Sequence, residues 1–339
     1  MAIETKILGN PGEDNATLLQ IDSGSSVELL LFDCGENCLD NLSVSAVQSI
    51  DHLFFSHFHM DHVCGFDRFF RLNYNRPEKP VVIWGPPGTI EVIHHRLCGV
   101  TWNLHHDQPG VWLVNEIDSG QVRTSRFLTR DAFHSGDVET PVPFNNGLFL
   151  EETNFSVSAK FLNHGTIPSL AYRVDEPVRE NIDPAQLEAS GLPPGPWIRD
   201  LKERTGDEGK IEVDGKIYPV KELKKSLLTE SSGCSAAYLT DFIVNPGSEE
   251  WRDICDWLGG VDTLICEAQF RESDNVLAET HAHMTTKRVG QLAADAGAGE
   301  LIIQHISRRY DESEWNEMLA EARSIFPQTK FPLSWKLNR

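Results

Sequence analysis

The chain lacks any long hydrophobic run. No stretch approaches the ~18–20 consecutive apolar residues of a transmembrane helix, so the sequence predicts no membrane partner. The first ten residues also lack a basic segment followed by an apolar one, and we therefore expect no signal peptide. The seven cysteines are an odd number at scattered spacings, which fits reduced thiols in a cytoplasmic protein better than a disulfide framework.

Basic residues are also scarce. Lys and Arg number 30 against 51 Asp and Glu, which gives a formal net charge of −21. Residues 1–160 carry 10 basic and 21 acidic side chains and residues 161–339 carry 20 and 30, so the excess is not an acidic tail. A uniform negative field repels polyanions at long range, which argues against a general nucleic-acid binder. It leaves open a local site that recognises phosphate.

Apolar residues are present at an ordinary 40% of 339 residues, enough for one large or two modest domains with a sizeable core. Short runs rich in branched and aromatic residues predict strands, and longer amphipathic segments predict helices. The expected strands are Ala16–Ile21, Val27–Phe32, His52–Phe55, Val81–Trp84, Ala236–Leu239, Thr263–Cys266 and Leu301–Gln304. The expected helices include Glu249–Leu258, Thr285–Ala296 and Glu312–Ile325. Residues 100–175 read as mostly β, and the whole indicates an α/β fold.

Residues 176–231 differ from the rest because prolines and glycines interrupt them. We interpret them as an inserted arm on a single α/β domain that spans residues 1–339. Within the arm, residues 197–225 hold eight basic and seven acidic side chains, which makes this the least acidic long stretch of the chain. A substrate-binding exosite and a solvated surface loop both fit this composition.

The strongest motif is Ser56-His57-Phe58-His59-Met60-Asp61-His62, directly after an apolar run. In an extended segment His57 and His59 leave the same face, and Asp61 and His62 then begin a helix that points to a second position. Imidazoles and carboxylates suit zinc or a similar divalent ion. One such run cannot complete two coordination spheres, so further ligands are expected at distant strand ends.

Three residues are candidates for the missing ligands. His164, Asp241 and His305 each end or follow a short apolar run, and each alone would more often be structural. An α/β sheet commonly gathers its active site at the carboxyl ends of its strands. Together the three supply one more histidine for each metal position and a carboxylate that can bridge them.

The His-x-His-x-Asp-His run resembles the metallo-β-lactamase superfamily, and the later segments resemble its ribonuclease Z (tRNA 3′-endonuclease) branch. The similarity runs from about Leu29 to Tyr310. It rests on Phe32-Asp33-Cys34-Gly35-Glu36, Leu192-Pro-Pro-Gly-Pro-Trp197, Glu267-Ala268, His283-Met-Thr-Thr286 and His305-Ile-Ser-Arg-Arg-Tyr310.

This resemblance implies an αββα sandwich with two zinc ions (Mn²⁺ or iron as alternatives) at one edge. It implies that His57, His59 and His164 hold the first ion, that Asp61, His62 and His305 hold the second, and that Asp241 bridges them. It implies that His283 protonates the leaving oxygen, that the protein acts on RNA, and that it forms a homodimer. Beside it, Glu267 could orient His283 or be a buried structural acid. Ser307 and Arg309 follow His305 and are candidates for substrate binding, and Arg309 could bind phosphate bidentately or pair with a surface acid.

The expected chemistry is two-metal hydrolysis, in which a water shared by the ions ionises near neutral pH and attacks the phosphorus, with Asp61 able to orient it. Three hypotheses follow. The first is a dizinc phosphodiesterase that cuts the 3′ end of a tRNA precursor. The second is a hydrolase of a small phosphodiester such as a cyclic nucleotide, a lactone or a thioester, which suits the acidity better. The third, a non-enzymatic metal-stabilised protein, is disfavoured by the complete ligand set.

Overall fold

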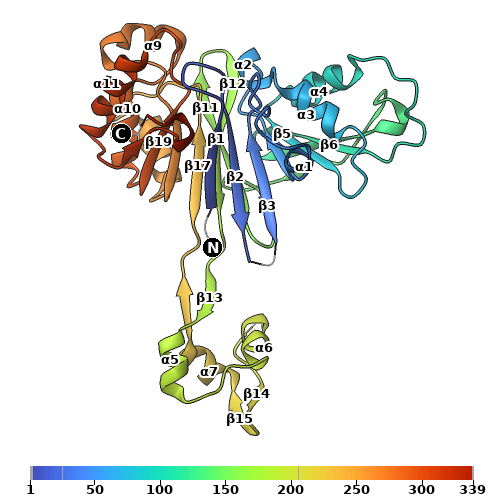
Figure 1. Ribbon diagram of the computed structural model, residues 1–339, viewed down its shortest axis with the longest axis vertical. Coiled ribbons are helices and arrows are strands. Elements are labelled where there is room, and N and C mark those ends of the chain that lie inside the picture. Colours follow the sequence, from blue (N-terminus) through green and yellow to red (C-terminus); the bar gives the residue numbers. More distant parts are fainter. Residues whose placement is uncertain (1–2, 25, 205, 338–339) are drawn as a thin grey trace. The chain divides into compact units, whose positions relative to one another are not determined.

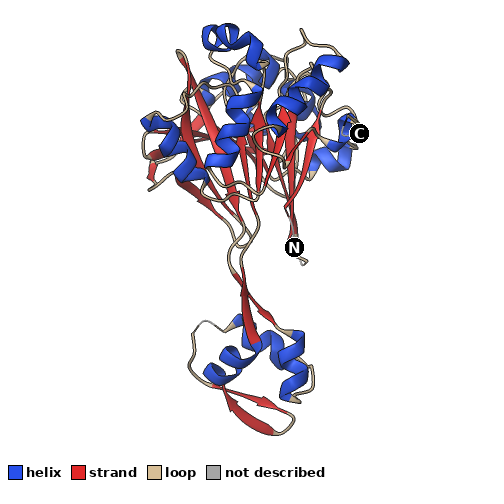
Figure 2. Ribbon diagram, turned by 90° about the vertical axis from the view of Figure 1, so that its left-hand side faces the viewer, coloured by secondary structure: helices blue, strands red, loops and turns tan. Residues whose placement is uncertain are grey.

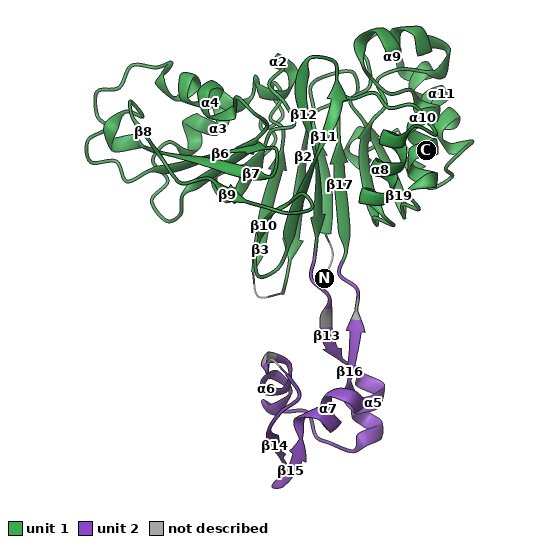
Figure 3. Cartoon of the chain, turned by 180° about the vertical axis from the view of Figure 1, so that it is seen from behind, with its two compact units in different colours: residues 1–175, 234–339 green, residues 176–233 purple. Residues whose placement is uncertain are grey.

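The computed structural model describes residues 3–24, 26–204 and 206–337. The chain divides into two compact units, which Figure 3 colours separately. Unit 1 comprises Met1–Asp175 and Cys234–Arg339, and unit 2 comprises Glu176–Gly233. In the described part of the chain, no helix combines the length and the apolar character that crossing a bilayer requires.

The first sheet of unit 1 takes its strands from the N-terminal part of the chain (Figure 1). Their order is β1-β2-β3-β4-β5-β6-β7-β8, and β9 also pairs with β7. The strands are β1 (Ile3–Leu8), β2 (Ala16–Asp22), β3 (Val27–Phe32), β4 (His52–Phe54), β5 (Val81–Gly85), β6 (Val111–Asp118), β7 (Gln121–Leu128), β8 (Gly136–Val138) and β9 (Val142–Pro143). Because β3, β4, β5 and β6 run parallel, the carboxyl ends of β3 and β4 meet at one edge.

The second sheet has the order β10-β11-β12-β17-β18-β19-β20. Its strands are β10 (Leu148–Glu151), β11 (Ser156–His164), β12 (Ile167–Asp175), β17 (Ser235–Leu239), β18 (Thr263–Glu267), β19 (Glu300–Gln304) and β20 (Thr329–Lys330). Strands β17 to β20 are parallel, so β17, β18 and β19 also end together.

The two sheets pack face to face. One buried cluster draws on both, with Leu30, Phe32 and Phe54 from the first sheet and Tyr172, Tyr238 and Ile265 from the second. Neighbouring residues of the same strands, such as Leu31 and Leu264, point the other way into clusters beneath the helices. Strands covered on both faces need apolar residues at consecutive positions, which explains their unbroken hydrophobic runs.

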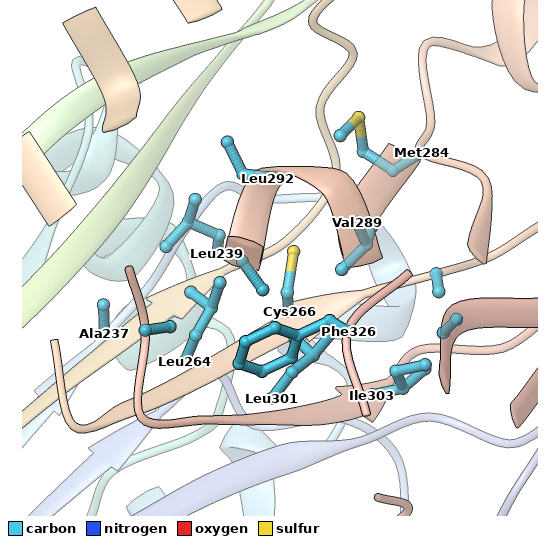
Figure 4. Packing of buried hydrophobic residues seen from close by; sticks show 14 of the residues in the cluster. Ala237, Leu239, Leu264, Cys266, Met284, Val289, Leu292, Leu301, Ile303 and Phe326 are labelled. Carbon is cyan, nitrogen blue, oxygen red and sulfur yellow. The ribbon is translucent and has the colours of Figure 1, made fainter. Parts of the chain in front are cut away.

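Helices cover the outer face of each sheet, as Figure 2 shows by colour. Beside the first sheet lie α1 (Val44–Gln48), α2 (Met60–Val63), α3 (Phe66–Asn73) and α4 (Thr89–Cys98). Beside the second lie α8 (Glu249–Leu258), α9 (Asn275–His281), α10 (Thr286–Asp295) and α11 (Glu312–Arg323). Short 3₁₀ turns lie at η1 (Thr129–Asp131), η2 (Glu272–Asp274) and η3 (Leu333–Trp335). In Figure 4, Val289 and Leu292 of α10 pack over Leu264 and Cys266 of β18. The expected αββα sandwich is therefore confirmed.

Unit 2 has secondary structure and a core of its own. Its elements are β13 (Arg179–Ile182), α5 (Pro184–Ser190), α6 (Trp197–Glu203), β14 (Lys210–Val213), β15 (Lys216–Pro219), α7 (Val220–Leu227) and β16 (Leu228–Ser231). Strand β13 pairs with β16, and β14 pairs with β15. Trp197 and Leu201 of α6 pack with Ile211, Leu223 and Leu227 in a buried apolar cluster. This unit is thus a folded module rather than a loop.

Candidate metal centre

The histidine run lies between β4 and α2. The chain leaves β4 at Phe54, and His59 caps α2 with extended backbone, φ −66° and ψ 154°. The side chains of His57 and His62 are buried, with 0% and 2% exposure. Asp61 stands in the first turn of the helix, where its carboxylate also suits the helix dipole.

The second sheet brings three more of the predicted ligands to this run. His164 is the last residue of β11, while Asp241 and His305 follow β17 and β19. The Asp241 carboxylate lies at the centre. Its Oδ2 is 3.5 Å from His57 Nε2 and 3.7 Å from His164 Nε2, while its Oδ1 is 3.3 Å from His62 Nε2 and 3.4 Å from His305 Nε2.

The predicted ligands fall into two groups that Asp241 joins. His57, His59, His164 and Asp241 each offer a ligand atom within 4.8 Å of the others, and so do Asp61, His62 and His305. Asp61 Oδ2 lies 3.4 Å from His305 Nε2 and 3.6 Å from His62 Nε2. Seven residues spread over most of the chain therefore converge as two adjoining donor sets.

Hydrogen bonds engage the outer ring nitrogens of two of the predicted ligands. His57 Nδ1 lies 3.0 Å from Ser56 Oγ, and His164 Nδ1 lies 3.2 Å from the carbonyl oxygen of Ala282. The Nε2 atoms of His57 and His62 are buried and have no hydrogen-bond partner in the described part of the chain. Buried polar nitrogens are costly unless something satisfies them, and two divalent ions would do so. The donor set therefore fits a dinuclear metal centre.

Asp33 is a functional residue that sequence analysis did not select. It follows β3, is fully buried, and its Oδ2 lies 2.7 Å from His62 Nδ1, from Ser56 Oγ and from Tyr238 OH. The serine hydroxyl donates to Asp33 and so accepts from His57 Nδ1–H, which places the lone pair of His57 on Nε2. Asp33 thereby fixes the ring orientation of one ligand in each donor set. Its place at a strand end, like that of Asp241, was the available signal.

The backbone at three strand ends is left-handed. Asp33, Asp241 and His305 have φ values of 57°, 49° and 49°. This region costs a non-glycine residue free energy and is found where surrounding contacts impose it, often at functional sites. Close backbone approach adds to the constraint, because a Cβ on Gly65 would fall 2.2 Å from the carbonyl oxygen of Gly35. The turn after β3 is thus locked against the end of α2.

Burial and mutual charge set the protonation of the ligands. Burial, followed by the neighbouring His62, lowers the pKa of His57 to about 2, so that this imidazole is a neutral ligand. Burial raises the pKa of Asp61, but the hydrogen bond from His305 and the charge of His62 outweigh it and hold this pKa below its usual range. Burial lowers the pKa of His305, but the carboxylates of Asp241 and Asp61 outweigh it and raise this pKa to about 9. A protonated imidazole cannot bind a metal ion, so protonation of His305 competes with metal binding.

His283 and Glu267 form a hydrogen-bonded pair beside the two donor sets. His283 Nδ1 lies 2.9 Å from Glu267 Oε2, while its Nε2 lies 4.0 Å from Asp241 Oδ2 and faces the centre. Burial lowers the pKa of His283, but the Glu267 carboxylate outweighs it and raises the pKa. Glu267 also accepts a hydrogen bond of 2.8 Å from the backbone N–H of Phe242, which ties the pair to the turn at Asp241.

The centre opens into two pockets that share Asp61, Gln269 and Ser307. One, of about 560 Å³, also contains His283 and Arg309, and the other is about 650 Å³. The guanidinium of Arg309 lies 5.3 Å from the ring centre of Phe270, a cation–π contact. The structure thus brings Ser307 and Arg309 beside the predicted ligands.

Comparison with known proteins gave three kinds of match. Residues 13–138 match the family model of the anti-Pycsar protein Apyc1. Ribonuclease Z from Deinococcus radiodurans is 42% identical over 333 residues, 98% of each chain. Ribonuclease Z from Geobacillus kaustophilus is 28% identical over 315 residues, which cover 90% of this chain and 86% of that protein.

Two solved structures are similar in fold. The metallo-beta-lactamase fold protein YhfI from Bacillus subtilis has a TM-score of 0.55 at 16% identity, covering 96% of this chain and 95% of its own. The short form of human tRNase Z has a TM-score of 0.50 at 18% identity, covering 91% and 93%. These likenesses support the αββα architecture.

Proposed function

The chain belongs to the ribonuclease Z family, since it is 42% identical to one member over 98% of both chains, and from this premise we propose that it cleaves the 3′ end of tRNA precursors. The reaction is hydrolysis of one phosphodiester by a metal-dependent enzyme. In our proposal the tRNA retains a 3′ hydroxyl and the released trailer retains the phosphate.

The observation that carries this proposal is the convergence of the donor atoms on Asp241, with two buried imidazole nitrogens that have no hydrogen-bond partner in the described part of the chain. We propose two Zn²⁺ ions, with Mn²⁺ or iron as alternatives. His57, His59 and His164 would hold the first, and Asp61, His62 and His305 the second, with Asp241 between them. Such ions lower the pKa of a bound water and offset the negative charge of the reacting phosphate.

The surrounding residues supply the remaining chemistry. Asp61 is less buried than the other carboxylates of the centre and can orient the attacking water as well as bind metal. His283 donates a proton from Nε2 to the leaving 3′ oxygen, and Glu267 positions its ring through Nδ1. Ser307 and Arg309 bind phosphate oxygens of the substrate beside the centre.

We further propose that unit 2 is a tRNA-binding exosite. Its eight basic residues between 197 and 225 are a local exception in a chain of net charge −21. Family membership supports a homodimer in the cytoplasm, and light scattering of the purified protein tests its mass in solution.

Cleavage of a precursor tRNA, compared with hydrolysis of bis(p-nitrophenyl) phosphate, tests the function. We expect both activities to disappear with a chelator and to return with Zn²⁺ or Mn²⁺, and metal analysis to give two ions per chain. Protein that cleaves neither substrate with either metal would refute the proposal.

Deletion of unit 2 tests the exosite. Asp175 and Ser235 are paired residues of adjacent strands, so a short linker can join β12 to β17 directly. We expect the deletion to leave hydrolysis of the small diester intact and to reduce tRNA cleavage strongly. Equal tRNA cleavage with and without the unit would contradict the exosite.

A small phosphodiester remains a second candidate substrate, because the net charge of −21 opposes a long polyanion. The match to the anti-Pycsar protein Apyc1 includes the histidine run but ends before His164, Asp241 and His305. A purified protein that hydrolyses cyclic nucleotides and leaves precursor tRNA intact would favour this candidate.

A further inference from the structure

The two pockets that open from the metal centre differ in charge. The histidine pocket contains His281, His283, Arg309 and Phe270, and its only carboxylates are the metal-group residues Asp61 and Asp241. The acidic pocket contains three further carboxylates, those of Glu13, Asp14 and Glu36, and a single arginine, Arg308. The acidic pocket is therefore lined by more negative charge than the histidine pocket.

His281 is the residue of the histidine pocket that has no role so far. It ends α9, is exposed, and its ring lies 6.3 Å from that of Phe270 at an interplanar angle of 17°. The next residue, Ala282, has a φ of 57°, and its carbonyl oxygen lies 3.2 Å from Nδ1 of the predicted ligand His164. The turn that carries His281 is therefore fixed to the metal centre, while the imidazole has no hydrogen-bond partner in the described part of the chain.

Arg309 contacts the same ring. Its guanidinium lies 5.3 Å from the ring centre of Phe270, and the described residues contain no carboxylate paired with it. An unpaired guanidinium and an imidazole N–H are suitable donors for the oxygens of a phosphate diester. Phe270, which is 3% exposed, gives both side chains a rigid support.

Electrostatics disfavour a phosphate in the acidic pocket. Glu13, Asp14 and Glu36 contribute three negative charges against one positive charge from Arg308. A like charge about 6 Å away costs on the order of 0.7–3 kcal/mol as the effective dielectric constant falls from that of water to about 20. A single phosphate is thus bound better in the histidine pocket than in the acidic pocket.

We infer that His281 and Arg309 hold the first phosphate on the leaving-group side of the scissile bond, and that the phosphate-bearing product faces the acidic pocket. This inference rests on the proposed function and adds the direction of the substrate. The attacking water releases one proton to the solvent and its oxygen bonds to phosphorus, the P–O3′ bond breaks, and O3′ takes its proton from His283. Because His283 lies in the histidine pocket, the tRNA end occupies that pocket and the trailer occupies the acidic one.

Precursor RNAs with one neutral methylphosphonate test this direction. Placed one linkage upstream of the cut, the neutral group should raise KM about tenfold, a change of about 1.4 kcal/mol, with little change in kcat. His281→Ala should raise KM for the unmodified RNA by a similar factor. It should have little further effect on KM for the RNA that carries the upstream methylphosphonate. His281→Asn, which keeps an N–H donor, should recover part of the loss, and exposed His106→Ala should match wild type.

The downstream linkage gives the opposite result. A methylphosphonate there should leave KM unchanged or lower it, and Glu36→Gln should lower KM only for RNA that is charged at this linkage. A larger effect downstream than upstream, or additive effects of His281→Ala and the upstream neutral group, would overturn the inference while RNA cleavage itself stands. Failure of the wild-type enzyme to cleave any RNA, with the small diester still hydrolysed, would instead overturn the proposed function and this inference with it.

Discussion

Replacing Asp33 by Asn tests whether a carboxylate outside the metal centre controls its affinity. Asn has the same shape and tolerates the left-handed backbone found at this position, φ 57°, so the turn should persist. Asp33 Oδ2 lies 2.7 Å from three donors, and Oδ1 accepts a hydrogen bond of 2.7 Å from the backbone N–H of Ser56. The substitution therefore removes one charge and turns one acceptor into a donor.

The magnitude follows from these four contacts. The Asn side chain keeps three of the four hydrogen bonds if its amide oxygen takes the place of Oδ2. Its NH₂ group then faces the backbone N–H of Ser56, which loses its acceptor. One unsatisfied buried donor costs about 1–3 kcal/mol, and each bond to a charged acceptor loses about 1 kcal/mol when the acceptor becomes neutral. A neutral side chain also costs less to bury than a charged one, which offsets part of this loss. We therefore expect the free energy of unfolding to fall by about 2–4 kcal/mol. Loss of orientation at His57 and His62 should weaken metal binding about 10- to 100-fold.

Competition with a chromophoric chelator measures the metal affinity, and urea unfolding with and without metal measures stability. Asp40→Asn is the matched control, because Asp40 is exposed and forms only a surface ion pair of 3.2 Å with Arg68. A folded Asp33→Asn protein that binds metal as tightly as wild type would refute the assigned role of Asp33.

Three further outcomes are expected. His283→Asn should reduce kcat for RNA by about 10²–10⁴ but affect bis(p-nitrophenyl) phosphate less than about tenfold, because p-nitrophenolate leaves without a proton; equal losses in steady-state assays on both substrates would contradict general-acid catalysis. Burial lowers the pKa of His52 from 6.5 to about 4. As the pH falls, the unfolded chain therefore takes up a proton at His52 before the folded chain does. The free energy of unfolding should drop by about 3 kcal/mol between pH 6.5 and 4. In urea titrations across this range His52→Gln should show a shallower decline, and an identical profile would exclude the assignment. Leu201→Ala, at a fully buried position of unit 2, should cost that unit about 2–5 kcal/mol and impair tRNA cleavage but not small-diester hydrolysis, with Gln186→Ala, at an exposed uncharged position of the same unit, as control; unchanged tRNA kinetics in a variant whose unit 2 has melted would contradict the exosite.

Much of unit 1 could be predicted from the sequence because local pattern and tertiary position agree there. The strand expected at Val27–Phe32 is β3, and the helix expected at Glu249–Leu258 is α8, with the same bounds. Each predicted ligand could be found because it ends or follows an apolar run. Asp33 was harder to find because an Asp before Cys-Gly also reads as an ordinary turn residue.

The remainder depended on contacts that no local pattern encodes. The helices and strands of unit 2 were not predicted, since frequent prolines and glycines hide apolar positions that meet only in the folded module, such as Trp197 and Ile211. His281 likewise carries no spacing signal. Its position depends on the left-handed turn at Ala282 and on the ring of Phe270, which lies well before it in the chain.

The proposed metal ligands come from both layers of the sandwich, with His57 and His62 after a strand of the first sheet and His164, Asp241 and His305 at the ends of strands of the second. Bound ions therefore cross-link the sheets, and neither donor set exists until both sheets have formed and docked. Capture of a second ion would then be a late event in folding, because His305 is synthesised after nearly all of the chain. A nascent or truncated chain that lacks this residue cannot complete the second donor set, so loading of both sets would distinguish finished molecules from unfinished ones.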